Sequence, residues 1–326
     1  MSIKDIQEYL KPSLAQVEAL IGESLRSDVA LLDATNRRLR ETPGKMLRPT
    51  LAILCGEACG EENADTIRFA AASELLHNAT LLHDDVVDGA QERRGVPTVA
   101  KLLSGSAAVL IGDFWLTRCM KTILDAQQHS ELALRVFAET LSHLAEGEIL
   151  QMQKASSADT TQADYDRIIF CKTASLFQAS ALSAAMSVNA ATEHLEAVKS
   201  YARALGMAFQ VKDDIFDYAP ASESLGKPVG IDLTEQKITQ PLLSALESVS
   251  ADEAAAVRRA VSRLSDNPEG ASAVRDFVYR NDGVQKARAV MDAHIASALE
   301  SLQALPQSRA REALEELARY VGNRDY

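Results

Sequence analysis

The hydrophobic and polar positions of this 326-residue chain follow a helical period almost throughout. Ala, Leu, Glu, Gln and Arg dominate, and the apolar and polar alternation typical of strands is scarce. We expect helices over residues 13–40, 45–60, 63–88, 97–104, 107–127, 130–154, 163–190, 192–218, 234–248, 251–265, 268–280 and 282–320. This pattern predicts an all-α fold.

The breaks between the periodic segments contain residues that end helices or form turns, such as Thr42-Pro43-Gly44 and Asn267-Pro268. The longest irregular stretch is 219–232, with two Pro and two Gly, and a lid over a site would lie there. No internal repeat and no linker divides the chain. We therefore expect residues 1–326 to form one large helical bundle around a central apolar cavity, with the site between facing helices.

Two aspartate clusters of the form DDxxD stand in apolar helical segments, LLHDDVVDGAQERRG and FQVKDDIFDYA. Their members are Asp84, Asp85 and Asp88 in the first and Asp213, Asp214 and Asp217 in the second. The first and last aspartates of each cluster project from nearly the same helix face, one turn apart. Like charges at that spacing oppose each other by roughly 0.2–0.5 kcal/mol, so a compensating cation is expected.

Carboxylate oxygens with no His or Cys among them suit Mg²⁺, which commonly bridges protein carboxylates to substrate phosphates. One isolated cluster is more often a solvated helix face than a metal site. Two clusters, both with apolar flanks and with basic residues nearby, favour the metal site.

Net charge and cysteine usage exclude several classes of protein. The chain has 34 basic and 46 acidic residues, a net charge of −12 and no basic tract, which argues against a nucleic-acid partner. The N-terminal MSIKDIQEYLKPSLAQ lacks the apolar core of a signal peptide, and no stretch approaches the roughly 20 apolar residues of a membrane span. The four cysteines, Cys55, Cys59, Cys119 and Cys171, form no CxxC pair. We expect a cytoplasmic protein with reduced thiols.

Several basic residues could bind diphosphate. Lys45 and Arg48 are three residues apart at a helix start and share a face. The other candidates are the adjacent Arg93 and Arg94, Lys172 with its neighbour Thr173, and Lys227 and Lys237, which bracket the loop of the segment GKPVGIDLTEQK. Each alone is typical of an ordinary surface charge. Together with the two carboxylate clusters they predict a cavity that holds diphosphates through Mg²⁺ and cations.

An ordered set of segments resembles the trans-type polyprenyl diphosphate synthases. The segments are GKMLRP, HNATLLHDDVVDGAQERRG, KTASLF, FQVKDDIFDY and GKPVGIDLTEQKITQP, and they cover about residues 40 to 245. One departure is Met46, where many members have Arg. The resemblance implies an isoprenoid synthase bundle, a homodimer packed through helices, and three Mg²⁺ ions in each site.

The resemblance also implies a role for each matching residue. Asp84 and Asp88 would be the main Mg²⁺ ligands of the first cluster and Asp213 of the second, with Asp214 and Asp217 acting largely through bound water. The residues matching those that hold the diphosphate of isopentenyl diphosphate are Lys45, Arg48, His77 and Arg94. Those matching the allylic diphosphate site are Arg93, Lys172 and Lys227, with Lys237 a weaker candidate. Thr173 and Gln210 match positions near the reacting carbons.

The implied reaction needs no protein nucleophile. The allylic diphosphate, farnesyl or geranylgeranyl diphosphate, ionises, the carbocation alkylates isopentenyl diphosphate, and released diphosphate takes the proton. Charge develops on the departing diphosphate, where Mg²⁺ and fixed cations stabilise it. An apolar tunnel excludes water from the cation.

Product length depends on residues upstream of Asp84. Thr80 and Ala79 lie roughly 6–7.5 Å from Asp84 along the helix axis, where the growing chain should pass. Relatives with short products resemble one another in having Phe or Tyr at one of these two positions. Both residues are small here, and Leu76, a further turn away, is only moderately bulky. We expect a deeper floor on the facing helix, around Leu144, Thr140 and Phe137, and an all-trans product of about C35 to C50, with octaprenyl the best guess. Such a product would partition into lipid, which favours transient contact with a membrane.

Other functions remain open. The ExxH pattern from Glu74 to His77 could indicate a di-iron bundle protein, but that architecture needs a second ExxH, which the chain lacks. A noncatalytic subunit of a heteromeric synthase would usually have an eroded aspartate cluster. A terpene cyclase usually lacks the second DDxxD and the GKxxRP segment. A short-chain synthase of about C15 to C20 is the remaining alternative, and it would need a blocked tunnel.

Overall fold

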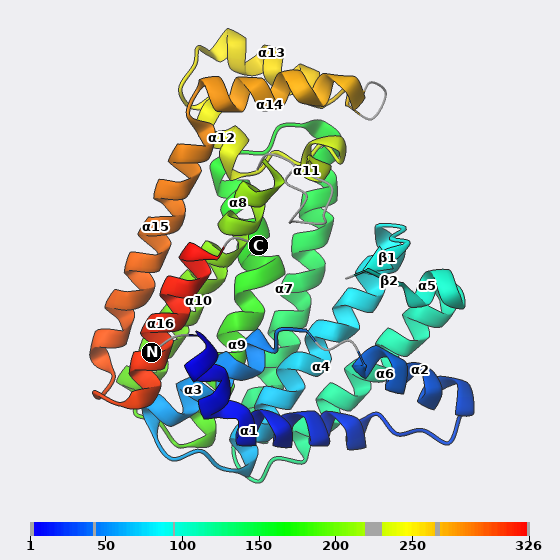
Figure 1. Ribbon diagram of the computed structural model, residues 1–326, viewed down its shortest axis with the longest axis vertical. Coiled ribbons are helices and arrows are strands. Elements are labelled where there is room, and N and C mark those ends of the chain that lie inside the picture. The colour runs from blue at the N-terminus through cyan, green and yellow to red at the C-terminus, as the bar shows by residue number, and fades with distance from the viewer. Residues whose placement is uncertain (1–2, 42–43, 94, 219–229, 265–267, 325–326) are drawn as a thin grey trace. The chain divides into compact units, whose positions relative to one another are not determined.

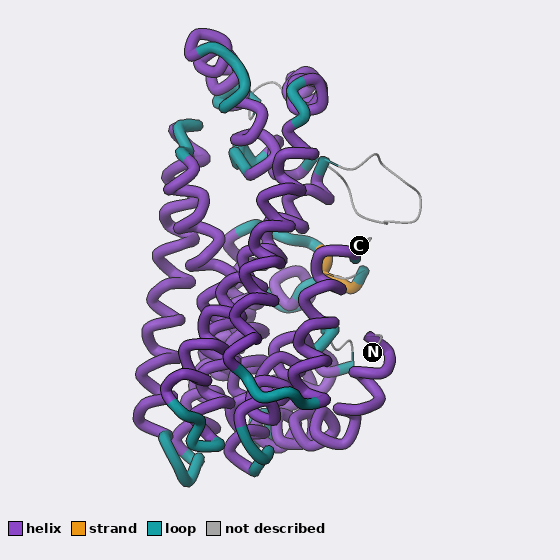
Figure 2. The backbone as a smooth tube through the Cα atoms, turned by 90° about the vertical axis from the view of Figure 1, so that its left-hand side faces the viewer, coloured by secondary structure: helices purple, strands orange, loops and turns teal. Residues whose placement is uncertain are grey.

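The structure is a computed structural model that describes residues 3–41, 44–93, 95–218, 230–264 and 268–324. These residues are mostly helical, and a single pair of short strands interrupts the described helices (Figures 1 and 2). The helices are α1 (Ile3–Ser24), α2 (Ala30–Arg40), α3 (Leu47–Cys59), α4 (Ala64–Val87), α5 (Val99–Leu102), α6 (Gly105–Leu124), α7 (Ser130–Ser157), α8 (Gln162–Ile169), α9 (Ser175–Ser187), α10 (Thr192–Asp217), α11 (Ile231–Thr234), α12 (Gln240–Leu246), α13 (Ala251–Val261), α14 (Ala271–Arg280), α15 (Gly283–Ser301) and α16 (Arg309–Asn323). The π-helix η1 (Phe170–Ala174), the 3₁₀ turns η2 (Pro268–Gly270) and η3 (Leu302–Ala304), and the strands β1 (Glu92–Arg93) and β2 (Val96–Pro97) complete the set. The all-α prediction is confirmed.

The first predicted helix, 13–40, is in fact two helices, and α1 begins ten residues earlier than expected. Pro12 lies inside α1, where a proline costs about 3 kcal/mol. Apolar residues on both sides of it, from Ile6 to Ile21, are buried on one face, and this packing outweighs the cost. The break before α2 has a local cause, because the Ser27 hydroxyl accepts the Val29 N–H at 3.2 Å and so competes with helical bonding.

Further differences concern later helices, among them α12, which begins at Gln240 and not at the predicted residue 234. The predicted segment 282–320 contains α15 and α16, separated at η3 and Pro306. The predicted segment 163–190 is helical from Gln162 to Ser187 but changes to π-helix at Phe170–Ala174. By length and composition this helix could cross a membrane, contrary to the expectation that no stretch would, but 78% of its apolar window is buried inside the protein. It is therefore a core helix.

The chain divides into two compact units, which we describe separately. Unit 1 contains Met1–Ala138, Ala179–Lys199 and Ala304–Leu314, and unit 2 contains Glu139–Gln178, Ser200–Gln303 and Glu315–Tyr326. The single domain expected for residues 1–326 stays a prediction.

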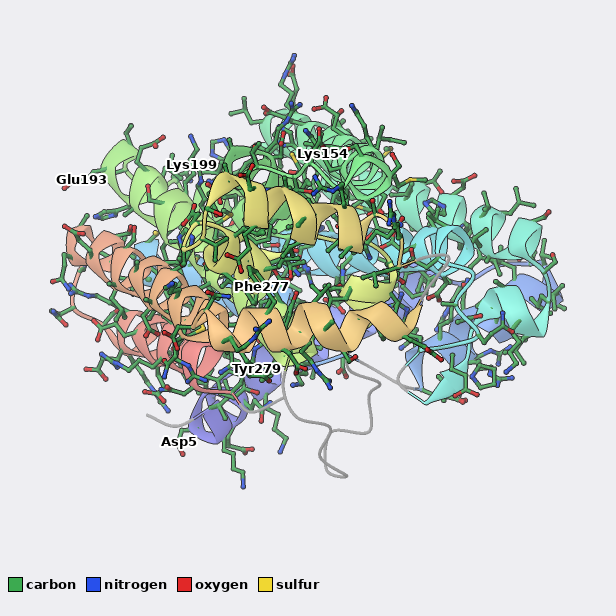
Figure 3. All side chains as sticks on the ribbon, turned by 90° about the horizontal axis from the view of Figure 1, so that it is seen from above. Asp5, Lys154, Glu193, Lys199, Phe277 and Tyr279 are labelled. Atoms are coloured by element: carbon green, nitrogen blue, oxygen red, sulfur yellow. The ribbon has the colours of Figure 1, made fainter. Side chains whose placement is uncertain are left out.

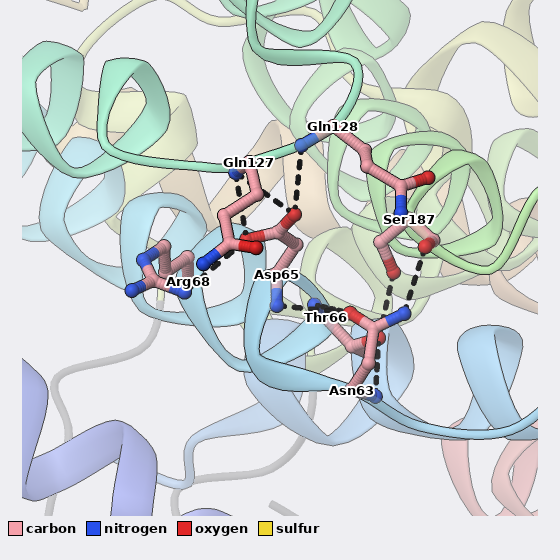
Figure 4. Close-up of polar contacts among 7 residues, drawn as sticks. All are labelled: Asn63, Asp65, Thr66, Arg68, Gln127, Gln128 and Ser187. Atoms are coloured by element: carbon pink, nitrogen blue, oxygen red, sulfur yellow. Dashed lines mark hydrogen bonds and ion pairs between the residues drawn. The ribbon is translucent and has the colours of Figure 1, made fainter.

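In unit 1, α4 packs against α6, α3 and α1 and is buried on most sides. Its N-terminus is anchored by polar contacts, shown in Figure 4. The Asn63 side chain caps the helix and donates to the Ser187 carbonyl at 2.8 Å. The Asp65 carboxylate accepts the backbone N–H groups of Gln127 and Gln128, both at 3.0 Å. These contacts fix the helix that carries the first aspartate cluster.

In unit 2, α12 packs against α15, α14 and α8. Phe277 and Tyr279 leave opposite sides of α14 (Figure 3): Phe277 is buried, and the partly exposed Tyr279 donates its hydroxyl to the carbonyl of Tyr218. Because Tyr218 directly follows α10, this bond secures the end of the helix that carries the second aspartate cluster.

Candidate active site

The first aspartate cluster lies at the C-terminal end of α4. Asp84 and Asp85 belong to its last turn, and Asp88 is the C-cap, with its N–H bonded to the Asp84 carbonyl at 2.8 Å. Asp85 is buried, Asp84 is half-buried and Asp88 is exposed. Asp84 and Asp88 therefore lie nearer the solvent than Asp85, consistent with the helix face that the first and last aspartates were predicted to share.

Arg93 reaches back to this cluster from the strand pair. Its Nε donates to Asp85 Oδ1 at 2.7 Å. Arg93 and Val96 are partners in the antiparallel pair, and the Thr98 hydroxyl, which donates to the Ala90 carbonyl at 2.8 Å, closes the loop behind it. The Asp85–Arg93 pair forms a polar part of the lining of a mainly apolar cavity of about 640 Å³ within unit 1.

Lys45 and Arg48 flank the start of α3, as predicted. Lys45 is exposed and Arg48 is half-buried in the first turn. Met46, the residue that departs from the resembling family, is the N-cap and has a left-handed backbone with φ of 49°. His77 is half-buried on α4. Arg94 and Lys227, also predicted to bind diphosphate, lie outside the described residues.

The second cluster connects to the predicted reaction-centre residues through hydrogen bonds. Thr173 donates to Gln210 Oε1 at 2.8 Å, and Gln210 donates to Asp214 Oδ1 at 3.1 Å. The Tyr165 hydroxyl donates to the other carboxylate oxygen at 2.6 Å. Asp214 is only 3% exposed, and this burial raises its pKa to about 7 against the lowering effect of the two donors. Thr173 and Gln210 are thus hydrogen-bonded to each other, and their predicted place near the reacting carbons stays a prediction.

Asp217 caps the short helix α11. Its carboxylate accepts the backbone N–H groups of Gly230, Ile231 and Asp232, each at 3.0 Å. Burial raises the pKa of Asp217, and the three N–H donors oppose that shift. Asp217 therefore holds the residues that follow the loop, and its predicted action through bound water stays a prediction.

Asp213 pairs with a cation that the sequence analysis missed. Arg324, just after α16, donates to Asp213 Oδ1 at 2.7 Å and to the Phe209 carbonyl at 2.9 Å. The guanidinium also lies over the Phe209 ring, 3.8 Å from its centroid. Because 111 positions separate Arg324 from Asp213, no local pattern could have indicated this pair.

Lys172 lies in the π-helix and is held from α7. Its Nζ is 2.5 Å from Glu148 Oε2 and donates to Gln151 Oε1 at 3.1 Å. Glu148 was not predicted, because an EGE run on an amphipathic helix is typical of a solvated face.

A cavity of about 150 Å³ in unit 2 brings several of these residues together. Its lining includes the predicted Lys172, Gln210, Asp214 and Lys237. It also includes Lys154, labelled in Figure 3, which pairs with Asp164 at 3.0 Å. The cavity lining therefore contains three ammonium groups together with the carboxyls of Asp214 and Asp232 and the amides of Gln151 and Gln210.

The carboxylates fit Mg²⁺ when a substrate supplies the remaining ligands. In the described part of the chain, no three His, Cys, Asp or Glu side chains are close enough to hold a metal ion by themselves. Asp84, Asp88 and Asp213 are at least partly exposed and offer only oxygen donors. Mg²⁺ keeps several waters and takes one or two carboxylates together with substrate phosphates, so the carboxylates of each cluster, taken separately, fit it.

Comparison with known proteins decides the family. The sequence profile of the polyprenyl synthetase family matches residues 29–278. The chain belongs to the polyprenyl synthetase family. It is 35% identical to octaprenyl diphosphate synthase of Haemophilus influenzae over 326 residues, which covers 100% of this chain and 98% of the relative. It is 34% identical to the geranyl-diphosphate-specific all-trans-nonaprenyl-diphosphate synthase of Rhodobacter capsulatus, over 99% of both chains.

A solved structure supports the polyprenyl synthetase fold. The polyprenyl synthase of Caulobacter crescentus, complexed with calcium and isoprenyl diphosphate, superposes with a TM-score of 0.90 and 34% identity, covering 100% of this chain and 98% of that one. Enzymes of the family are prenyltransferases that use isopentenyl and allylic diphosphates and depend on a divalent metal ion. The predicted fold class and enzyme class are therefore confirmed. The di-iron alternative is wrong.

Proposed function

We propose that this polyprenyl synthetase condenses an allylic diphosphate, farnesyl or geranylgeranyl diphosphate, with successive isopentenyl diphosphates to give an all-trans product of about C35 to C50, with octaprenyl as the best guess. The observation that carries the proposal is the small side chain at Thr80, one turn before Asp84 on α4. The names of the octaprenyl and nonaprenyl relatives also favour a long product.

The environment of Thr80 supports a path for the growing chain. Thr80 is half-buried, and its hydroxyl is turned back to the His77 carbonyl at 2.8 Å, so its methyl group is left to contact an apolar chain. A residue four positions before Asp84 shares its helix face, about 6 Å along the axis. Ala79 and Leu76 are buried in the packed core of unit 1. Thr80 is therefore the stronger of the predicted length-determining positions.

Asp84, Asp88 and Asp213 would hold Mg²⁺, three ions in each site, which supplies Lewis-acid stabilisation to the departing diphosphate. Asp85 keeps its partner Arg93 fixed at 2.7 Å, which sets the guanidinium beside the cluster before substrate binds. Arg93, Lys172, Lys227 and, more weakly, Lys237 would bind the allylic diphosphate. Lys45, Arg48, His77 and Arg94 would bind isopentenyl diphosphate.

Thr173 and Gln210 would lie beside the reacting carbons. Their mutual hydrogen bond, and that from Gln210 to the buried Asp214, fix both dipoles before the reaction starts. The proton lost at the end goes to the released diphosphate.

We also propose a cytoplasmic homodimer. An exposed apolar stripe on α6 supports it, because Val109, Leu110, Met120 and Leu124 are each at least 38% exposed. Side chains of this kind in one row favour burial against another protein surface.

The metal-dependent step is tested with purified protein, farnesyl diphosphate and labelled isopentenyl diphosphate. We expect polyprenyl product with Mg²⁺ and none after chelation with EDTA. Asp84→Ala and Asp213→Ala should each lower turnover by orders of magnitude, on the order of 10³-fold, while the helical circular dichroism persists. Near-normal turnover in either variant would remove that cluster from the mechanism.

A further inference from the structure

Lys172 lies at an irregular point of an otherwise regular helix. The five residues Phe170–Ala174 form a π-helix between α8 and α9. Short π segments insert one extra residue into a helix and occur frequently at functional sites. The insertion changes the direction in which Lys172 and Thr173 project relative to the residues before them.

Close backbone packing holds this π-helix on two sides. A Cβ on Gly147 of α7 would lie 2.6 Å from Cys171 Cβ and 3.1 Å from Lys172 Cγ. A Cβ on Gly206 of α10 would lie 2.6 Å from Ala174 Cα. Both glycines therefore permit an approach that a larger residue would prevent, and the position of Lys172 is set by contact with α7.

The residue after Gly147 completes the arrangement. Glu148 and Gln151 are three positions apart on α7 and so share a face, and that face meets the Lys172 ammonium at 2.5 and 3.1 Å. The neighbouring Ile149 and Met152 are both exposed, on the other side of the helix. The side chains of Lys172 and Glu148 are only 29% and 22% exposed, so their attraction is less screened than that of a surface pair.

We propose that Glu148 and Gln151 are positioning residues for the allylic diphosphate site, acting through Lys172. This inference rests on the proposed function. An ammonium has three donors, and the two oxygens from α7 occupy two of them. The third donor is left for a ligand in the cavity that Lys172 lines with Gln210 and Asp214. Glu148 also balances the ammonium charge before the diphosphate arrives, so the side chain is ordered in advance.

The test compares single variants with a reciprocal exchange. Glu148→Gln removes the carboxylate and keeps its shape, Gln151→Glu adds one, and the double variant E148Q/Q151E moves the carboxylate from one neighbour of Lys172 to the other. Glu146→Gln is the matched control. Glu146 lies two residues before Glu148 on the same helix, and it pairs with Arg167 on the exposed surface at 3.1 Å. For each protein, kcat and KM are measured for farnesyl diphosphate and for isopentenyl diphosphate, with the Tm from circular dichroism.

We expect Glu148→Gln to lower kcat/KM for farnesyl diphosphate by about 10-fold or more, with KM for isopentenyl diphosphate within about twofold of the wild type. In the double variant, kcat/KM for farnesyl diphosphate should recover to within about threefold of the wild-type value. Glu146→Gln should have the wild-type value. Recovery in the double variant is the result that a purely structural role would not give.

Two results would overturn the inference: unchanged farnesyl diphosphate kinetics in Glu148→Gln, or a double variant no better than Glu148→Gln. Failure of the proposed function itself would look different, because the wild-type protein would then form no polyprenyl product from any allylic diphosphate.

Discussion

Arg324 and Asp213 form a half-buried ion pair, 2.7 Å apart, that ties the end of α16 to the second aspartate cluster. The Arg324 side chain is 7% exposed and that of Asp213 is 42% exposed. The cation is thus buried on an aromatic ring while the carboxylate keeps a side open to solvent. One side of Asp213 is therefore open for the metal ion that we propose it binds, while its charge is already partly balanced.

Arg324→Ala should lower the free energy of unfolding by about 2–4 kcal/mol, because it leaves a carboxylate without its buried cation and removes the stacking on Phe209. Urea denaturation measures the change. The control is Arg319→Ala on the same helix, whose exposed pairs with Glu315 and Glu316 should contribute about 0–1 kcal/mol. Equal losses in the two variants would show that the Asp213 contact does not stabilise the fold.

The contacts of Asp164 predict that part of the free energy of unfolding depends on pH. Its carboxylate accepts the Thr161 N–H and hydroxyl and pairs with Lys154, and these contacts lower the pKa of Asp164 to about 2. Since the folded pKa lies below the ordinary value of 3.8, the stabilisation is fully present above about pH 4 and is lost as the pH falls toward 2.

Asp164→Asn should therefore lower the Tm by about 2 °C at pH 7, and the difference from wild type should shrink as the pH is lowered from 5 to 3. Thermal scans in matched buffers measure it. Asp166→Asn, two residues along α8, is the control. A Tm difference that stays constant over this pH range would contradict the assignment.

Thr80→Phe should shorten the product toward about C15 to C20 with turnover retained, because the ring would close the path of the growing chain one turn from Asp84. Ala79→Phe should shorten it too, but Ala79 is 0% exposed, so overpacking should also lower the free energy of unfolding by about 1–3 kcal/mol. Chromatography of the dephosphorylated products measures length. An unchanged distribution in a folded and active Thr80→Phe variant would show that the chain does not pass this face.

The two diphosphate sites should separate kinetically. Lys45→Ala and Arg48→Ala should each raise the KM for isopentenyl diphosphate by about 10-fold, whereas Lys172→Ala should act mainly on the allylic substrate, since each removes a charge-assisted hydrogen bond to one diphosphate. Steady-state kinetics with each substrate varied in turn distinguishes them. If Lys45→Ala and Arg48→Ala acted mainly on the allylic substrate and Lys172→Ala on isopentenyl diphosphate, the two sites would be assigned the wrong way round.

Local patterns in the sequence predict most of the helices and the residues within each motif. The spacing of Asp84, Asp85 and Asp88 predicts that the first and last share a helix face, and in the structure these two are less buried than Asp85. The strand pair at Glu92–Pro97 was missed, because two-residue strands have no period to detect. The predicted helix starts at residue 13 instead of Ile3, and Pro12, a residue that disfavours helix interiors, lies inside α1.

Contacts between distant segments could not be predicted in the same way. The pairs Arg324–Asp213 and Tyr165–Asp214 join helices that are far apart in sequence, and the spacing of residues along one sequence contains no signal for them. The π-helix at Lys172 depends on how closely Gly147 and Gly206 approach it. The helical period of apolar residues contains no information about that approach. The sequence therefore provides candidate residues for the site but does not predict how each side chain is held.

The most direct test of a long-chain synthase is the product of the wild-type protein. Purified protein is incubated with Mg²⁺, farnesyl diphosphate and excess isopentenyl diphosphate, and the dephosphorylated alcohols are separated and weighed by mass spectrometry. We expect a main product within about C35 to C50, with C40 the most abundant, because Thr80 leaves the path beyond Asp84 open. A main product of about C15 to C20 would contradict the proposal and would mean that the path closes at or before Thr80.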